Sequence, residues 1–127
     1  MLDKARRDPL VNVEETDRDR KTRVINDYFR CVVKGRLQDL PITTDYGSES
    51  PQSGLVKGAQ AVAYLGSIGA EMTDIRVMQN IVEGNFVATY FEEITPQSVL
   101  PIVGLFEFSG DKIKFVRVFF DSAHLGA

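Results

Sequence analysis

Among the residues in this sequence whose chemistry allows proton transfer are a histidine, an aspartate and a tyrosine. His124 is the single histidine and follows Asp121 by three residues, a spacing that allows an acid/base dyad. Tyr28 lies within a run of apolar residues at helical spacing, where a buried hydroxyl needs a hydrogen-bonding partner. The structural alternatives are an exposed histidine near the C-terminus and a core tyrosine bonded to the backbone.

Motifs for other kinds of chemistry are missing from the sequence. Cys31 is the single cysteine, and one cysteine and one histidine far apart do not make a metal site. Residues 47–54 form a loop by composition but lack the lysine and spacing of a P-loop. No Gly-x-Ser-x-Gly nucleophile motif occurs. We therefore predict neither a metal nor a cofactor.

Composition places the chain among ordinary globular domains. It has 127 residues, 43% hydrophobic and 26% charged, which suits one domain with a modest core. The net charge of −3 argues against nucleic-acid binding, and no apolar run approaches the roughly 20 residues of a membrane span. We therefore expect neither nucleic-acid nor membrane partners. A single cysteine suits a reducing compartment, so we expect a cytoplasmic protein.

The first 15 residues and the rest of the chain read differently. Residues 1–15 look like an N-terminal arm that Pro9 interrupts. Leu10 and Val11 of this arm either dock on the domain or belong to a frayed tail. Residues 16–127 form a single domain. Its first helix starts at Thr16 or Asp17, which are acceptable N-caps, and stops at Gly35.

The middle of the chain alternates short elements. Residues 36–40 suggest a short second helix, and residues 42–46 read as a strand. A further helix opens at Gly58 and fades through Gly66 and Gly69. Residues 75–82 and 86–94 are two strands joined by a tight turn.

The last part of the chain is a strong hairpin signal. Residues 99–108 and 113–120 are apolar runs around a turn in which Gly110 is free to adopt positive φ. We expect Ile113, Phe115 and Phe119 on one face of the last strand, and Val116, Val118 and Phe120 on the other. Helices followed by a run of strands predict an α+β fold, a curved antiparallel sheet with helices on its concave face.

This order of elements resembles the nuclear transport factor 2-like superfamily, the cone-shaped fold of ketosteroid isomerase, limonene epoxide hydrolase and SnoaL-type cyclases. The resemblance covers roughly residues 20–125. It is carried by the loop 47–54, the helix start at 58–62, the strand 101–108 with its turn and Ile113, and the closing run 117–121. The fold hosts enzymes and binding modules alike.

The ketosteroid isomerase resemblance implies two catalytic residues. Asp45 precedes a loop similar to the one that follows that family's catalytic aspartate, so it looks like the base. Tyr28 lies where the family has its oxyanion tyrosine. Gly104 falls where the family's protonated aspartate stands, so half of the oxyanion hole is missing. A turn-capping role is the alternative for Asp45.

The resemblance to limonene epoxide hydrolase carries less of its chemistry. The position of that family's arginine is occupied by Phe91, and the position of its last aspartate by Val118. Glu93 is the single acidic residue that matches one of the family's acids. A lone carboxylate cannot both activate water and protonate an epoxide. SnoaL-type cyclases use a late aspartate, but Asp121 falls on the face away from the pocket, which favours a cap or an interface contact.

The fold implies an apolar pocket with ionisable groups Tyr28, Asp45 and Glu93. Its predicted walls are Phe91, Phe106, Val116, Val118 and Phe120. A carboxylate against such walls has a raised pKa and serves as a general acid or base near neutrality. For Glu93 the alternative is a strand-end carboxylate in water beside Glu92.

These observations favour a cofactor-free enzyme that moves a proton on a hydrophobic carbonyl compound, as an isomerase, cyclase or dehydratase does. Asp45 would be the base, and Tyr28 would polarise the oxygen. The competing function is a non-catalytic ligand-binding or dimerisation module of the same fold, and epoxide hydrolysis is less favoured.

The outer face of the sheet predicts a homodimer. Ile113, Phe115 and Phe119 of the last strand share this face with Phe86, Ala88 and Tyr90, and in water they would form a contiguous apolar patch larger than monomers usually show. The superfamily resemblance points the same way, since its members commonly pair through this face. Arg117 lies among these residues, where we expect it to pair with Glu92 of either subunit.

Overall fold

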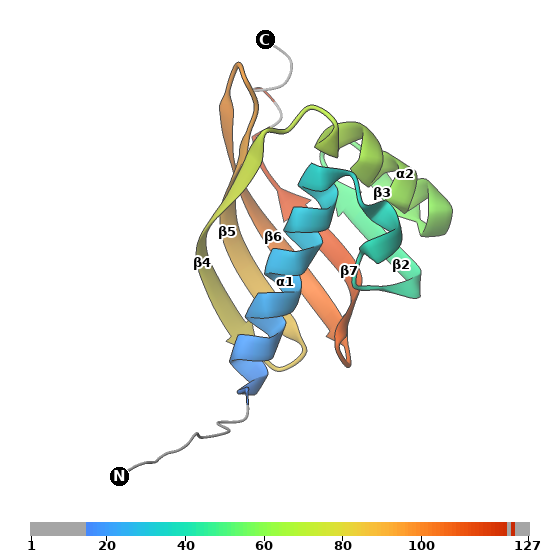
Figure 1. The fold of residues 1–127 in the computed structure, drawn as a ribbon, viewed down its shortest axis with the longest axis vertical. Helices are drawn as coiled ribbons and strands as arrows, with labels where there is room; N and C mark the ends of the chain where they lie inside the picture. Colours follow the sequence, from blue (N-terminus) through green and yellow to red (C-terminus); the bar gives the residue numbers. More distant parts are fainter. Residues whose placement is uncertain (1–14, 122, 124–127) are drawn as a thin grey trace.

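The structure is a computed structural model that describes residues 15–121 and 123. Two α-helices and a short 3-10 helix lie on one face of a curved six-stranded sheet (Figure 1). The predicted arm, residues 1–15, falls almost wholly outside the described residues, and so does His124. The elements are α1 (Asp17–Lys34), η1 (Leu37–Asp39), β2 (Ile42–Ser50), β3 (Gly54–Lys57), α2 (Gly58–Gly69), β4 (Asp74–Glu83), β5 (Phe86–Ile94), β6 (Val99–Ser109) and β7 (Lys112–Phe119).

Helix α1 begins and ends where its capping residues predict. The Thr16 side chain accepts a hydrogen bond from the Asp19 backbone N–H at 3.0 Å, which satisfies one of the free donors of the first turn. At the other end Gly35 adopts φ 72°, and its amide and that of Arg36 bond back to the last turn. The helix therefore presents one fixed apolar stripe, which includes Tyr28, to the sheet.

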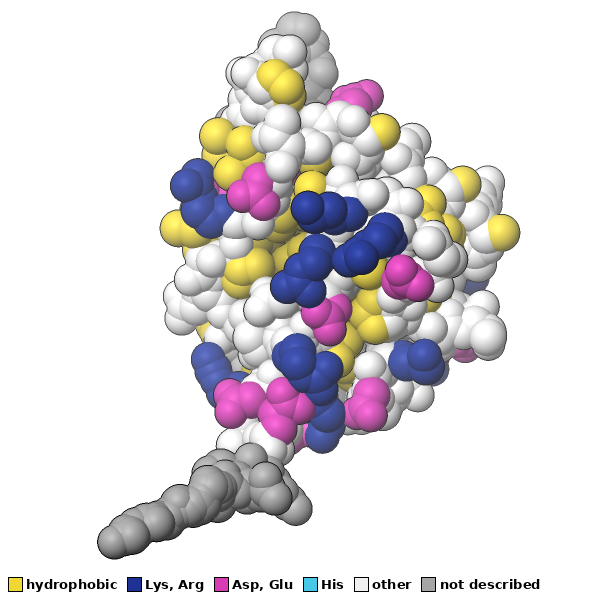
Figure 2. Space-filling view, viewed as in Figure 1, with side chains coloured by type: hydrophobic (Ala, Val, Ile, Leu, Met, Phe, Trp, Pro, Cys, Tyr) yellow, Lys and Arg dark blue, Asp and Glu magenta, His cyan; other side chains and the backbone are white. Residues whose placement is uncertain are grey.

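Charged side chains cover the opposite side of α1. Figure 2 shows Lys, Arg, Asp and Glu side chains gathered along the middle of the face on which α1 lies in Figure 1. Arg30 pairs with Asp27 at 2.7 Å, and Arg23 pairs with Glu15 at 2.9 Å. These exposed pairs keep the outer side of the helix in water and contribute little stability.

The sheet has the strand order β3-β2-β7-β6-β5-β4. Four of its pairings are antiparallel, as expected, but β2 pairs with β7 in parallel. This pairing differs from the predicted all-antiparallel sheet because α2 and the long meander separate the two strands in sequence. It places the first strand of the sheet, β2, beside the last strand, β7, one strand in from the edge formed by β3.

Strand β2 is longer than predicted. The Gly and Ser content of residues 47–50 predicts a loop, but these residues continue the strand: all four pair with β3, and 47–49 also pair with β7. Gly47 fits there because a Cβ would lie 3.1 Å from the Val56 carbonyl oxygen and 3.2 Å from the Phe115 ring. The turn comprises residues 51–53 alone.

A β-bulge changes the faces of β7. The register shifts between Glu107 and Phe108 of β6, opposite Lys114 of β7. Ile113 is therefore fully buried with Val116, and the prediction that it lies on the outer face is wrong. Phe115 and Phe119 do face outward, and Phe119 is 54% exposed.

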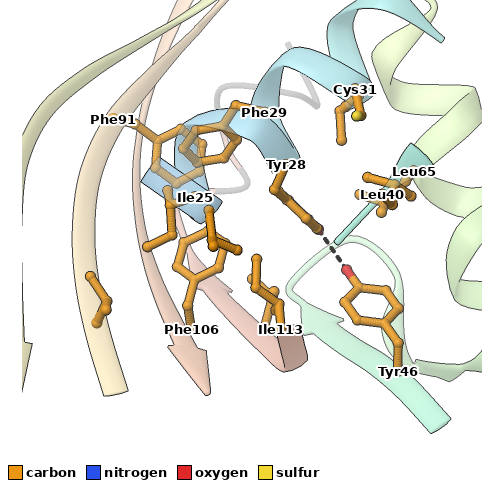
Figure 3. Packing of buried hydrophobic residues seen from close by; sticks show 14 of the residues in the cluster. Ile25, Tyr28, Phe29, Cys31, Leu40, Tyr46, Leu65, Phe91, Phe106 and Ile113 are labelled. Atoms are coloured by element: carbon orange, nitrogen blue, oxygen red, sulfur yellow. Dashed lines mark hydrogen bonds between the residues drawn. The ribbon is translucent and has the colours of Figure 1, made fainter. Parts of the chain in front are cut away.

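The core fills the space between α1 and the concave face of the sheet. Phe29 and Phe91 have ring centroids 4.6 Å apart, and the Phe106 ring meets both Tyr28 and Phe29 edge-on (Figure 3). Helix α2 crosses close to α1 at Gly69, where a Cβ would lie 2.4 Å from the Val32 carbonyl oxygen. Neither described helix has the length and apolar character of a membrane crossing.

Candidate functional site

A cavity of about 80 Å³ lies between the helices and the concave face of the sheet. The predicted walls Phe91, Phe106, Val116, Val118 and Phe120 all line it. Helices α1 and α2 complete the enclosure with Phe29, Val32 and Leu65. Among the groups that can transfer a proton, Tyr28 and Glu93 line the same cavity.

Glu93 faces inward because of strand alternation. In β5, Val87, Thr89, Phe91 and Glu93 point to the concave face, while Glu92 points outward and pairs with Arg76 at 2.9 Å. Burial raises the pKa of Glu93 from 4.5 to about 7, because desolvation penalises the charged form. Glu93 is thus a carboxyl group whose two protonation states are both populated near neutrality.

Tyr28 bonds to a second tyrosine rather than to the backbone. Its hydroxyl oxygen lies 2.5 Å from that of Tyr46 on β2, and both side chains are buried (Figure 3). Burial raises the pKa of Tyr28 well above its usual value and the pKa of Tyr46 to about 12. Both phenols therefore stay protonated, and while one hydrogen lies in the bond between them, the other is available to a further acceptor.

Tyr46 is the residue that sequence reasoning missed. In β2, residues 46, 48 and 50 are buried, so Tyr46, Ser48 and Ser50 share the inward face. The alternation of side chains along the strand predicts that Tyr46 faces inward, but only if the predicted strand is extended through Ser50. Ser48 and Ser50 line the cavity and Tyr46 lies behind Tyr28.

Asp45 does not reach the cavity. Adjacent residues in a strand point to opposite faces, and Tyr46 takes the inward place. The Asp45 carboxylate is exposed and accepts a hydrogen bond from the Thr43 hydroxyl at 2.7 Å. This bond, the main cause, lowers the pKa of Asp45. The prediction that Asp45 shares a cavity with Tyr28 and has a raised pKa is therefore wrong.

The position that the resemblance assigns to a protonated aspartate is closed by aromatic rings. Gly104 faces inward on β6, and a Cβ there would lie 2.9 Å from Phe106 and 3.2 Å from Phe91. No side chain larger than hydrogen fits unless these rings move. The cavity therefore carries one inward carboxyl from this part of the sheet, that of Glu93.

One further predicted contact differs in the structure, and another agrees with its prediction. Arg117 pairs with Glu49 of β2 at 2.8 Å, across the parallel pairing, rather than with Glu92. The Asp121 side chain accepts a hydrogen bond from the Ala123 backbone N–H at 3.0 Å, which is a capping contact. Among residues 15–121 and 123, no group of three or more His, Cys, Asp or Glu side chains is arranged to hold a metal ion.

No protein-family model and no curated protein sequence matches this chain. Solved structures do match it. They include an NTF2-like protein of unknown function from Burkholderia xenovorans, with TM-score 0.67 and 19% identity, covering 82% of this chain and 84% of that one. Another is SalBIII, an epoxide hydrolase/cyclase-like enzyme of pyran ring formation in salinomycin, with TM-score 0.73 and 20% identity, covering 84% and 95%.

A third similar structure is a de novo designed protein with a curved β-sheet, with TM-score 0.74 and 19% identity, covering 85% of this chain and 90% of that one. Further matches carry assignments as a SnoaL-like polyketide cyclase and a ketosteroid isomerase. At these identities the likeness concerns the backbone, and natural enzymes share it with a designed protein. The chain has the nuclear transport factor 2-like fold.

Proposed function

We propose that this protein catalyses proton transfer on a small apolar carbonyl compound, with Glu93 as the general acid/base. The observation that carries this proposal is the inward Glu93 carboxyl in an apolar cavity that it shares with Tyr28. A group whose pKa lies near 7 both accepts and releases a proton at neutral pH. Isomerases, cyclases and dehydratases need this step at the carbon beside a carbonyl.

Tyr28 is suited to bind the carbonyl oxygen. If Tyr46 donates to Tyr28, the Tyr28 proton is free to point at a ligand in the cavity, since one hydroxyl carries one hydrogen. A neutral phenol in a water-poor site stabilises the negative charge that develops on the oxygen when the neighbouring carbon loses its proton. Tyr46 acts as a positioning residue behind it.

This assignment moves the base from Asp45 to Glu93. It keeps the reaction class that the sequence favoured, because an inward carboxyl and an inward tyrosine are present together. Epoxide hydrolysis remains less favoured, since Phe91 and Val118 stand as apolar walls where the resemblance places an arginine and a second acid. The alternative, a binding module without catalysis, predicts ligand binding that leaves the ligand unchanged.

We also propose that two copies of the chain pair through the outer face of the sheet. Phe119, Val103 and Tyr90 are direct cross-strand neighbours there, and each is between 41% and 54% exposed. Ile81 and Phe86 extend this apolar surface toward β4. Burial of such a surface against a second copy contributes roughly 25 cal/mol per Å² before the costs of association.

The catalytic proposal is tested with cyclohex-3-en-1-one, a small ketone whose conversion to the conjugated enone requires removal and return of a proton. We expect the native protein to accelerate this isomerisation, followed by NMR. Glu93→Gln should lower kcat/KM by about 10²- to 10⁴-fold. Glu92→Gln, one residue away on the opposite face, should leave it unchanged.

Two outcomes contradict the proposal. One is a native protein that shifts the NMR signals of the ketone, and so binds it, without accelerating its isomerisation. The other is Glu93→Gln with native activity. The first outcome favours the binding module.

A further inference from the structure

A second cavity of about 290 Å³ adjoins the first at one end of the sheet. We call the two the outer and inner chambers. Their linings share six residues: Gln52, Tyr64, Ile68, Met72, Glu93 and Leu100. The remaining outer residues come from the end of α2 and the turn after it, and from the β5–β6 turn and the start of β6; these segments lie near each other at the top of Figure 1. Glu93 therefore stands at the junction of the two chambers.

The two chambers differ in chemistry. The inner chamber is walled mainly by aromatic and aliphatic side chains from α1, α2 and the sheet, with Ser48 and Ser50 of β2 as hydroxyl groups. The outer chamber adds hydroxyl and carboxyl groups from Ser67, Glu71, Thr95 and Ser98. A ligand that fills both must therefore be apolar at one end and polar at the other.

Hydrogen bonding within the outer chamber occupies two of its hydroxyl donors and leaves acceptor oxygens and the Gln52 amide N–H groups for a ligand. The Tyr64 hydroxyl donates to the Gln52 side-chain oxygen at 2.9 Å, and the Ser67 hydroxyl donates to the Tyr64 carbonyl at 2.8 Å. These donors are thus occupied, while the Ser67 oxygen still has lone pairs. The exposed Glu71 carboxylate adds two acceptor oxygens. Hydroxyl groups of a ligand, which both donate and accept, match this set.

The charge of the chambers excludes one class of ligand. Among the described residues that line them, none is Lys, Arg or His, while Glu49, Glu71 and Glu93 are acidic. Glu49 is neutralised by Arg117, but Glu71 has no ion pair in the described part of the chain. A carboxylate or phosphate in the outer chamber would meet like charge without a compensating cation.

We propose that the two chambers form one site for an uncharged amphiphile that carries an apolar ring or short branched chain in the inner chamber and a hydroxyl-bearing portion in the outer chamber. The reacting carbonyl lies at the junction, beside Glu93, a placement that rests on the proposed function. The substrate class is then a hydroxylated, neutral carbonyl compound, and free acids, phosphate esters and phosphate-bearing thioesters are not substrates.

Three probes with one ring test this class: 3-(cyclohexyloxy)propane-1,2-diol, cyclohexanol and cyclohexyloxyacetate. Their dissociation constants are measured by ¹⁵N–¹H NMR titration of the native protein. We expect the diol to bind tightest and to shift amides around both chambers, including those of Ser67 and Thr95. Cyclohexanol should shift inner-chamber amides, and the acetate should bind most weakly.

A charge reversal provides the sharper readout. Glu71→Lys should lower the dissociation constant of cyclohexyloxyacetate about two- to five-fold, the range of an exposed charge pair. It should leave the dissociation constant of cyclohexanol unchanged. Glu83→Lys is the matched control, since it makes the same change in net charge at an exposed residue that lines neither chamber. It should leave the dissociation constants of all three probes unchanged.

The proposal is overturned if the acetate binds as tightly as the diol, if none of the probes binds, or if both lysine variants act alike on the acetate. The ranking of the probes does not depend on catalysis. If the ranking holds while the ketone assay fails, the catalytic proposal alone is lost. If the assay succeeds while the ranking fails, the substrate class alone is lost.

Discussion

The hydroxyl oxygens of Tyr28 and Tyr46 lie 2.5 Å apart, although one residue belongs to α1 and the other to β2. The contact joins the helix layer to the sheet behind the inner chamber (Figure 3). Both hydroxyls are buried, so each depends on the other to replace its bond to water. The pair thus fixes the orientation of the Tyr28 phenol, which lines the cavity.

Removal of either hydroxyl should destabilise the protein unequally. Ser48 lies beside Tyr46 on the inward face of β2 and interacts with its hydroxyl, so Tyr28→Phe leaves Tyr46 with a polar neighbour. Tyr46→Phe removes the partner of Tyr28, which should cost about 1–3 kcal/mol, whereas Tyr28→Phe should cost less. Urea unfolding of the two variants and of the double variant gives their free energies of unfolding. Equal costs, or a larger cost for Tyr28→Phe, would contradict the assigned network.

Glu93 should make the free energy of unfolding depend on pH. Its pKa is about 7 in the folded protein and 4.5 when unperturbed, so the folded state holds the proton more tightly. Stability from this group is therefore full below pH 4.5, falls as the pH rises from 4.5 to 7, and stays low above 7.

Glu93→Gln should remove this dependence. Relative to native protein, it should be more stable by up to about 3 kcal/mol at pH 8, and this gain should vanish near pH 4.5. Glu92→Gln, which removes an exposed ion pair, should change stability by less than about 1 kcal/mol at both pH values. A Glu93→Gln gain that is the same at pH 5 and pH 8 would show that this carboxyl is not held in an apolar site.

Phe119→Asp should convert a dimer into monomers. The substitution places an unpaired charge among Phe119, Val103 and Tyr90, where a second copy would have to desolvate it. Leu55→Asp is the control, because Leu55 is 57% exposed but lies on the edge strand β3. Light scattering at tens of micromolar should give twice the chain mass for native protein and Leu55→Asp. A monomeric native protein would show that this face has another role.

Local signals in the sequence predicted most of the elements. Thr16 and Gly35 correctly predict where α1 begins and ends, because capping depends on neighbouring residues. The turn at Gly110, which adopts φ 61°, likewise predicts the β6–β7 hairpin from neighbouring residues alone. Tyr28 and Glu93 were placed correctly on the cavity because helical spacing and strand alternation held without interruption through α1 and β5.

The errors arose where pairing between distant strands decided the outcome. Residues 47–50 have loop-like composition but become strand because β7 pairs with them in parallel. Once they are strand, alternation turns Tyr46 inward and Asp45 outward. The bulge opposite Lys114 similarly reverses the face of Ile113, and no local pattern marks it. Register is set by tertiary contacts, so the tyrosine pair was beyond prediction from the sequence.

The pH dependence of cyclohex-3-en-1-one isomerisation tests the central claim, that Glu93 is the proton-transferring group. Because the base must be ionised in the free protein, kcat/KM should rise with pH and level off, with a midpoint near the Glu93 pKa of about 7. Glu92→Gln should show the same profile, and Glu93→Gln should lose both the rate and the inflection. A native profile without an inflection near pH 7, or an inflection that persists in Glu93→Gln, would contradict this account.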